Sequence, residues 1–196
     1  MDRRSWDRIV SGAAAVVAVT LIVLGGMAIY GGQFGRQNVR DRLEPQSIAF
    51  PPADAMTPEE KAEVGQFAGQ TVDNGVEAEA FSRYIGGHLA FVNDGKTYSE
   101  TSSEARALEE DDPARAELDA KVQTLFRGET LRSILLNAYG WWTVATITLW
   151  AGFAAVAAGI VLGALSILGF RHARKVTAGT YAEHRVESPE YAGASN

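Results

Sequence analysis

Two long stretches without any Asp, Glu, Lys or Arg constrain the fold of this chain most strongly. They are residues 9–35 and 133–170, and nearly all of the charged residues lie between them or outside them. The overall apolar share of 46% is ordinary, so composition alone would suit a soluble protein. A single soluble core does not segregate charge in this way, because its elements mix apolar and polar residues at short period. We therefore predict an all-α membrane protein, in which two transmembrane helices flank a small, mostly helical extracytoplasmic domain.

The first apolar segment is long enough to cross a bilayer. At about 1.5 Å of rise per residue, residues 9–30 would extend roughly 33 Å. A cleaved signal peptide is the competing interpretation, because three arginines precede the segment. The apolar run is longer than the usual ~7–15 residues of a signal core, and no small-residue cleavage site follows it. We predict a retained transmembrane helix at residues 9–32, after a cytoplasmic N-terminal segment at residues 1–8.

The second apolar segment is too long for one ordinary span. Trp141 and Trp142 divide it, since indole rings favour the membrane–water interface. This places the second transmembrane helix at residues 141–170 and a cytoplasmic tail at residues 171–196. Apolar residues also recur at helical spacing just before the tryptophans. They indicate either an amphipathic interfacial helix near residues 129–140 or a helix that runs straight into the span.

The segment between the spans, residues 33–140, carries four helix signals. The Thr-Pro-Glu-Glu run at residues 57–60 has the pattern of a capping box with Pro at the first helical position, and it predicts a helix to about residue 71. An apolar face predicts a second helix around residues 81–92, and a third is expected at residues 99–109. A fourth begins at Pro113, capped by the preceding aspartate. No alternating strand pattern is present.

The charge distribution predicts the orientation in the membrane. Residues 36–132 contain 11 basic and 19 acidic side chains, whereas the two ends outside the apolar segments contain 7 basic and 5 acidic ones. Cytoplasmic segments carry the excess of Lys and Arg. We therefore expect a multi-pass protein of the plasma membrane, with both termini in the cytoplasm and the central domain outside.

No cluster of residues points to catalysis or to a cofactor. Cysteine is absent, which removes thiolate nucleophiles and zinc–thiolate sites. Only His88 lies on the exported side, on an apolar helix face where a packed histidine is commoner than a ligand. The acidic run at residues 109–112 lacks the ligand spacing of a calcium loop and indicates a solvated turn. The net charge of −6 disfavours a nucleic-acid partner. We predict a protein that is not an enzyme, with no cofactor of its own and no metal site.

Small residues in the second span are the strongest candidates for a contact. Their four-residue spacing would let another helix approach closely, either the first span or a helix of a partner. The apolar residues just before the span are further candidates for contact with a partner. The predicted interaction residues are Ala151, Ala155, Gly159 and Gly163 within the span, Leu131, Ile134 and Leu135 before it, and Trp141 and Trp142 at its start.

Three parts of the chain together resemble a known family. Residues 67–80, residues 84–89 with 94–100, and residues 123–142 are similar to small actinobacterial membrane proteins with two spans and an exported helical domain. The likeness extends over about residues 50–170. The family includes an association factor of the mycobacterial respiratory supercomplex, which joins a cytochrome bcc complex to an aa3-type oxidase. The resemblance implies a non-catalytic accessory subunit, with the membrane and subunits of that complex as partners and lipid as a further candidate.

Two other functions compete with the accessory subunit. One is a stand-alone envelope scaffold or sensor whose exported domain binds a ligand. The other is a metal-dependent ring-cleaving enzyme, which would need two histidines and a carboxylate around one metal. The single histidine of the exported side argues against this enzyme.

Overall fold

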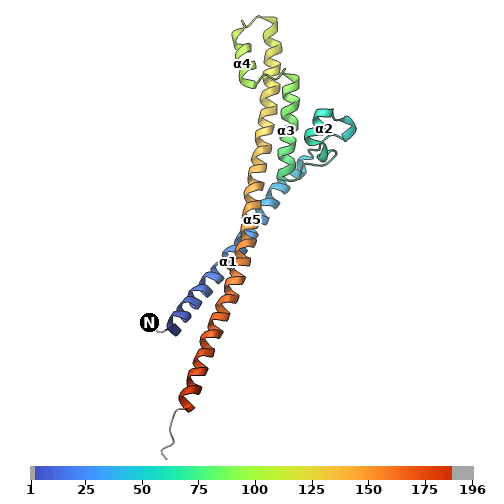
Figure 1. Cartoon of the computed structure of the whole chain (residues 1–196). Helices are drawn as coiled ribbons and strands as arrows, with labels where there is room; N and C mark the ends of the chain where they lie inside the picture. Colours follow the sequence, from blue (N-terminus) through green and yellow to red (C-terminus); the bar gives the residue numbers. More distant parts are fainter. Residues whose placement is uncertain (1–2, 187–196) are drawn as a thin grey trace, which may run out of the picture. The chain divides into compact units, whose positions relative to one another are not determined.

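The computed structural model describes the backbone of residues 3–186 and the side chains of residues 5–172. The outer parts of the predicted terminal segments, 1–8 and 171–196, lie outside these residues. The described part is helical, as predicted (Figure 1). Its elements are α1 (Arg3–Leu43), the 3₁₀ helices η1 (Glu44–Gln46) and η2 (Ala53–Ala55), α2 (Pro58–Val64), η3 (Gly65–Phe67), α3 (Gly75–Val92), α4 (Tyr98–Ala107) and α5 (Pro113–Val186).

The helices α1 and α5 are long and apolar enough to cross a membrane. In each helix, only 11% of the most apolar 18-residue window is buried within the chain. Large aliphatic side chains such as Val16, Met27 and Ile160 are 59–67% exposed. A core helix of a soluble protein would cover such a surface, because each exposed aliphatic side chain forfeits its transfer free energy from water. The exposed surface of both helices suits a lipid environment.

Both long helices extend beyond the predicted spans. The predicted interfacial helix near residues 129–140 is not a separate element, because these residues lie inside α5 without a break. Of the two interpretations left open by the sequence, the structure has the continuous helix. The reason is local: α5 contains no proline after its first residue, and α1 ends two residues before Pro45. Proline inside a helix removes a hydrogen bond and clashes with the preceding turn.

The chain divides into two compact units. Unit 1 contains Met1–Tyr30 and Leu149–Asn196, and unit 2 contains Gly31–Thr148. Each long helix contributes to both units.

Unit 2 has a core of its own. Phe50 stacks on Phe67 at 5.4 Å between ring centroids and meets Phe81 edge-on at 5.0 Å. Val64 and Val72 are fully buried beside them. The helix α3 lies alongside the part of α5 that belongs to this unit (Figure 1). The segment between the two charge-free stretches therefore forms a packed helical domain.

The capping box of α2 is confirmed, but the helix is shorter than predicted. The Thr57 hydroxyl accepts a hydrogen bond from the Glu60 amide, and the Glu60 carboxylate accepts one from the Thr57 amide at 2.8 Å. The helix ends at Val64 and η3 follows, whereas the sequence predicted helix to about residue 71. The chain then turns at Gly69, whose φ is +72°, a left-handed conformation that glycine adopts without a steric cost.

This turn lets two short segments of unit 2 pair with each other. The Phe50 amide donates to the Gln70 carbonyl at 2.9 Å, and the Val72 amide donates to the Ile48 carbonyl at 2.8 Å. The pairing forms one isolated bridge, and the described residues contain no longer strand. It brings Phe50 and Val72 into the core of the unit.

Candidate functional site

In unit 1, glycines bring the backbones of α1 and α5 into close contact. A Cβ atom on Gly25 would stand 2.8 Å from the carbonyl oxygen of Gly152, and one on Gly152 would stand 2.7 Å from the carbonyl oxygen of Gly25. Gly159 is packed in the same way, because its Cβ would lie 2.9 Å from the carbonyl oxygen of Ala18. In lipid, close approach of this kind adds van der Waals contact and weak Cα–H hydrogen bonds.

One hydrogen bond joins the two helices inside this apolar contact. The Ser166 hydroxyl donates to the backbone carbonyl of Ser11 at 2.6 Å, and both residues are buried. Gly169 faces the Ser11 side chain so closely that no Cβ would fit there. The bond pairs the start of α1 with the far end of the apolar part of α5, so the two helices are antiparallel.

Only some residues of the predicted stripe of small residues lie in the contact with α1. Gly159 is buried and Gly163 is half-buried, with the Gly163 Cβ position 3.7 Å from the Ala18 side chain. Ala151 is exposed and Ala155 only half-buried, so the contact does not follow the four-residue spacing. In unit 1, the small buried residues of α5 recur every seven residues instead, at Gly152, Gly159 and Ser166.

On α1 the buried residues also recur every seven residues, at Ser11, Ala18 and Gly25. A seven-residue period keeps one face of each helix against the other along a left-handed supercoil. The sequence left open whether the small residues meet the first span or a helix of a partner. In this structure they meet α1 of the same chain.

In unit 2, Trp142 is held between a glycine and an arginine. The Arg36 guanidinium lies over its indole ring, 4.4 Å from the ring centroid. Gly75, the first residue of α3, packs directly against the Trp142 side chain and leaves no room for a Cβ. Gly35 contacts Ala145 on the next turn of α5, where a Cβ would lie 2.9 Å from the alanine Cβ. Trp142 is thus a core residue of its own unit.

The remaining residues predicted to contact a partner fall into two groups. Leu135, like Trp142, is buried within unit 2 and offers no surface to a partner. Leu131, Ile134 and Trp141 are 54–64% exposed. Their exposure follows from the same helical period, because residues 135 and 142 face α1 and α3 while their neighbours point away.

A groove of about 740 Å³ runs between the end of α1 and the facing part of α5 in unit 2. One end is lined mainly by apolar residues, including Gly31, Phe34, Trp141 and Val144. Toward the other end, polar and basic side chains join apolar ones, with Asn38, Arg42, Gln46 and Asn137 among them. On α1, its apolar end lies within the last residues of the charge-free segment. The groove therefore changes character along its length, from apolar near that segment to partly polar away from it.

Arg42 is the basic residue that lines this groove. Its Nε donates to the Asn38 side-chain oxygen at 2.8 Å. Among the described residues no carboxylate lies within ion-pair distance of Arg42, whereas the neighbouring Arg40 pairs with Asp73 at 3.5 Å. The guanidinium of Arg42 keeps donors available to another group.

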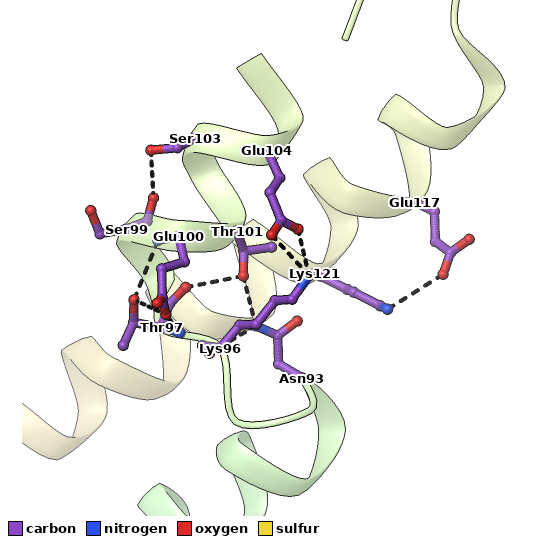
Figure 2. A network of polar contacts seen from close by, with 10 residues as sticks. All are labelled: Asn93, Lys96, Thr97, Ser99, Glu100, Thr101, Ser103, Glu104, Glu117 and Lys121. Atoms are coloured by element: carbon purple, nitrogen blue, oxygen red, sulfur yellow. Dashed lines mark hydrogen bonds and ion pairs between the residues drawn. The ribbon is translucent and has the colours of Figure 1, made fainter. Parts of the chain in front are cut away.

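A polar network holds the turn between α3 and α4 in unit 2 (Figure 2). The buried Asn93 side chain donates to the Thr101 hydroxyl at 2.7 Å and to the Lys96 carbonyl at 2.9 Å. Lys96 also reaches Glu104 at 2.8 Å. A second capping box starts α4, in which the Glu100 carboxylate accepts from the Thr97 amide at 2.7 Å. These bonds order the turn.

Three titratable groups of unit 2 have shifted pKa values. Burial, assisted by the negative charge of Glu60, raises the pKa of the Tyr84 phenol. The hydrogen bond to Glu104 is the main cause of a raised pKa at Lys96. The hydrogen bonds from the Thr97 backbone and side chain lower the pKa of Glu100. All three shifts follow from structural packing and capping, which are ordinary causes of such changes.

His88 does not lie in the core of unit 2, one of the two places, core or interface, that the sequence favoured over a ligand role. Its side chain is exposed, with its ring 6.5 Å from that of Tyr84. The buried residues of α3 are mostly small, such as Ala78 and Ser82, because the helix approaches its neighbours closely. Within the described part of the chain, no group of three or more His, Asp or Glu side chains is placed to hold a metal ion.

Sequence reasoning missed three features of these contacts. Gly25 and Gly152 could have been found from the seven-residue recurrence of small residues in each apolar segment. The Thr-Tyr-Ser-Glu run at residues 97–100 has the capping-box pattern and marks the start of α4. The groove carries no sequence signal, because its walls come from two helices about 100 positions apart in the sequence.

These observations define an all-helical chain with two long apolar helices, packed through small residues, and a helical domain between them. Comparison with protein-family models, with curated proteins and with solved structures finds no match to this chain. Its function is therefore argued from its own residues and from the resemblance given above.

Proposed function

We propose that this chain is a non-catalytic accessory subunit of a respiratory supercomplex in the plasma membrane. In this proposal α1 and α5 cross the bilayer and unit 2 lies on the extracytoplasmic side. The partner complex, cytochrome bcc with an aa3-type oxidase, is indicated by the resemblance of residues 67–80, of residues 84–89 with 94–100, and of residues 123–142. The accessory subunit would stabilise or assemble that complex through contacts of its spans and of its exported domain.

The observation that carries the proposal is the way unit 1 uses its surface. The small residues Gly25, Gly152 and Gly159 are buried in the contact between α1 and α5, so they are not available to a partner. The outward surface consists of large aliphatic and aromatic side chains, among them Leu24 and Leu165, which are 57% and 59% exposed. The antiparallel pair of α1 and α5, a helical hairpin, would be anchored in the membrane by lipid contacts. Its outer faces would remain available to other subunits, which suits an attachment role.

Unit 2 also offers contact surface, at the start of the second charge-free segment. Ile134 and Trp141 are exposed there, and aromatic residues are enriched in the centres of protein interfaces. Together with Leu131, these two residues remain available to a partner, whereas Leu135 and Trp142 are buried. The acidic residues 109–112 at the tip are a weaker candidate, because exposed ion pairs contribute only ~0–1 kcal/mol each.

The test is purification of the tagged chain from native membranes in a mild detergent. Proteins that co-purify are identified by mass spectrometry, and haem is measured by absorbance. We expect cytochrome subunits in amounts equal to the tagged chain. Recovery of the folded chain without them would overturn the proposal and favour the stand-alone scaffold or sensor.

A paired variant locates the contact. Ile134→Ala with Trp141→Ala should release the chain from the complex, whereas Glu109→Ala with Glu110→Ala should leave it bound. Membrane levels of the two variants are matched first, since a chain that fails to insert would mimic release. Release of only the acidic variant would show that the tip carries the contact instead.

A further inference from the structure

We propose that the groove between α1 and α5 in unit 2 binds one anionic phospholipid of the outer leaflet. Its headgroup would lie at Arg42 and Asn38, and its acyl chains would lie along Phe34 and Val144. The inference rests on the two apolar helices crossing the membrane. It does not depend on which complex the chain joins.

The groove lies where the charge-free segment of α1 ends and charged residues begin. The charge-free segment of α1 ends at Gly35, and the groove begins at Gly31, just inside that segment. Arg36 and Trp142, which are stacked on each other, come next. Tryptophan and arginine are residues that mark the membrane–water interface. The apolar end of the groove would thus face acyl chains, and the polar end would face headgroups.

The length of the groove is close to the thickness of one lipid leaflet. One wall of the groove is formed by residues 31–46, which belong to α1 and η1. At the rise of a helix, this wall extends roughly 20 Å. One leaflet, including its headgroups, is also roughly 20 Å thick, half of the ~40–45 Å of a whole bilayer. The groove volume of about 740 Å³ is large enough for a headgroup and the upper part of an acyl chain, as small-molecule sites of ~300–1,000 Å³ show.

The basic residue that faces the groove favours an anionic headgroup. Unit 2 is acidic as a whole, yet three arginines follow within the seven residues after the charge-free segment of α1. Arg36 is stacked on Trp142 and Arg40 is paired with Asp73, which leaves Arg42 to face the groove. Arginine forms paired hydrogen bonds with phosphate oxygens. The amides of Asn38 and Asn137, which also line this part, add neutral hydrogen-bonding groups.

The experiment uses the full-length chain in a mild detergent and measures bound lipid by native mass spectrometry. Phosphatidylglycerol and phosphatidylcholine with identical acyl chains are added at equal concentration. We expect the chain to retain phosphatidylglycerol in preference to phosphatidylcholine. Equal retention of the two lipids would overturn the proposed anionic headgroup site.

Two variants test the two ends of the groove, each with a matched control. Arg42→Gln should lower the retained phosphatidylglycerol about fivefold, the size of effect expected for one basic residue at a lipid surface. Arg127→Gln, an exposed arginine of α5 outside the groove, should leave it unchanged. Gly31→Trp should abolish retention, because a side chain at Gly31 meets no atom within 4 Å and would enter the groove.

The control for Gly31→Trp is Gly26→Trp, since Gly26 is also open and lies outside the groove. If Gly31→Trp fails to fold, Arg42→Gln still decides the question, because it removes only a polar surface group. Retention equal to that of the unaltered chain in Arg42→Gln would overturn the site.

A photo-crosslinker at Phe34 in native membranes separates lipid from a protein occupant. A lipid adduct supports the proposal, and a protein adduct shows that a partner fills the groove. Co-purification of cytochromes is read on the unaltered chain, so failure of one proposal is distinguishable from failure of the other.

Discussion

Gly25 of α1 and Gly152 of α5 face each other so closely that a Cβ atom on either would stand within 2.8 Å of the other's carbonyl oxygen. The obstacle is backbone and not a side-chain end, so it does not move aside at small cost. The adjacent Gly26 has no atom within 4 Å of its Cβ position. Two neighbouring glycines of the same helix therefore have opposite roles.

The first prediction concerns this pair of glycines. Gly25→Ala should destabilise the folded hairpin by about 1–3 kcal/mol, the usual cost of overpacking. Gly26→Ala should be neutral or slightly stabilising, because alanine is favoured over glycine within a helix. Thermal unfolding of the two variants in the same detergent measures the difference. Equal midpoints would show that α1 and α5 do not meet at Gly25.

The second prediction concerns the contact of α3 with Trp142. Gly75→Ala should destabilise unit 2 by about 1–3 kcal/mol, because the new methyl group would overlap the Cβ and ring of Trp142. Gly87→Ala on the same helix is the control, since its Cβ position is open. Tryptophan fluorescence during chemical unfolding reports the change. A Gly75→Ala variant as stable as Gly87→Ala would contradict this packing.

The third prediction concerns the buried hydrogen bond between Asn93 and Thr101 at the turn between α3 and α4. Thr101→Val removes the acceptor of the Asn93 side chain and should cost about 1–3 kcal/mol, the penalty of an unsatisfied buried polar group. Ser103→Ala also removes a hydroxyl that bonds to the backbone, but at an exposed position. It should change stability by less than about 0.5 kcal/mol. Hydrogen exchange of the α3–α4 turn distinguishes the two variants, and equal protection would count against the network.

The fourth prediction is a dependence on pH at the start of α4. The pKa of Glu100 is lowered in the folded chain by hydrogen bonds from Thr97. A carboxyl group with a lowered pKa stabilises the fold above its unfolded pKa, and this contribution is lost as the pH falls through the lower folded value. Protection of α4 amides should therefore decrease in acid.

The control for this pH dependence is Glu100→Gln, which keeps a side-chain acceptor but does not titrate. The advantage of the unaltered chain over this variant should be present near neutral pH and should shrink in acid. Hydrogen exchange at α4 across that range measures it. An advantage that stays constant with pH would assign the effect to another group.

The fifth prediction is the topology. We expect the ends of the chain in the cytoplasm and unit 2 outside, from the charge distribution. Single cysteines at Ser5 and Ser103 can be labelled, because both residues are exposed and the chain contains no other cysteine. An impermeant reagent on intact cells should label Ser103→Cys only. Labelling of Ser5→Cys alone would reverse the orientation.

The sequence by itself determined the elements of this chain. The two charge-free segments marked the parts of α1 and α5 that could cross a membrane. Thr57 with Glu60, and Pro113 after Asp112, marked helix starts that the structure has. Such signals are local, because a cap or an apolar run depends on residues a few positions apart. The same local reasoning placed the end of α2 too late. The turn at Gly69 allows the backbone of Gln70 to pair with that of Phe50, a contact between residues 20 positions apart.

Only the tertiary structure decided which face of each helix meets another element. Ala151 and Gly152 are adjacent small residues, yet Ala151 is exposed and Gly152 lies on the backbone of Gly25. Likewise Trp141 lines a groove, whereas Trp142 is buried between Arg36 and Gly75. One residue along a helix rotates a side chain by about 100°. The facing element selects the rotation that fits, and that element lies about 70 to 130 positions away in the sequence, where no local pattern can specify it.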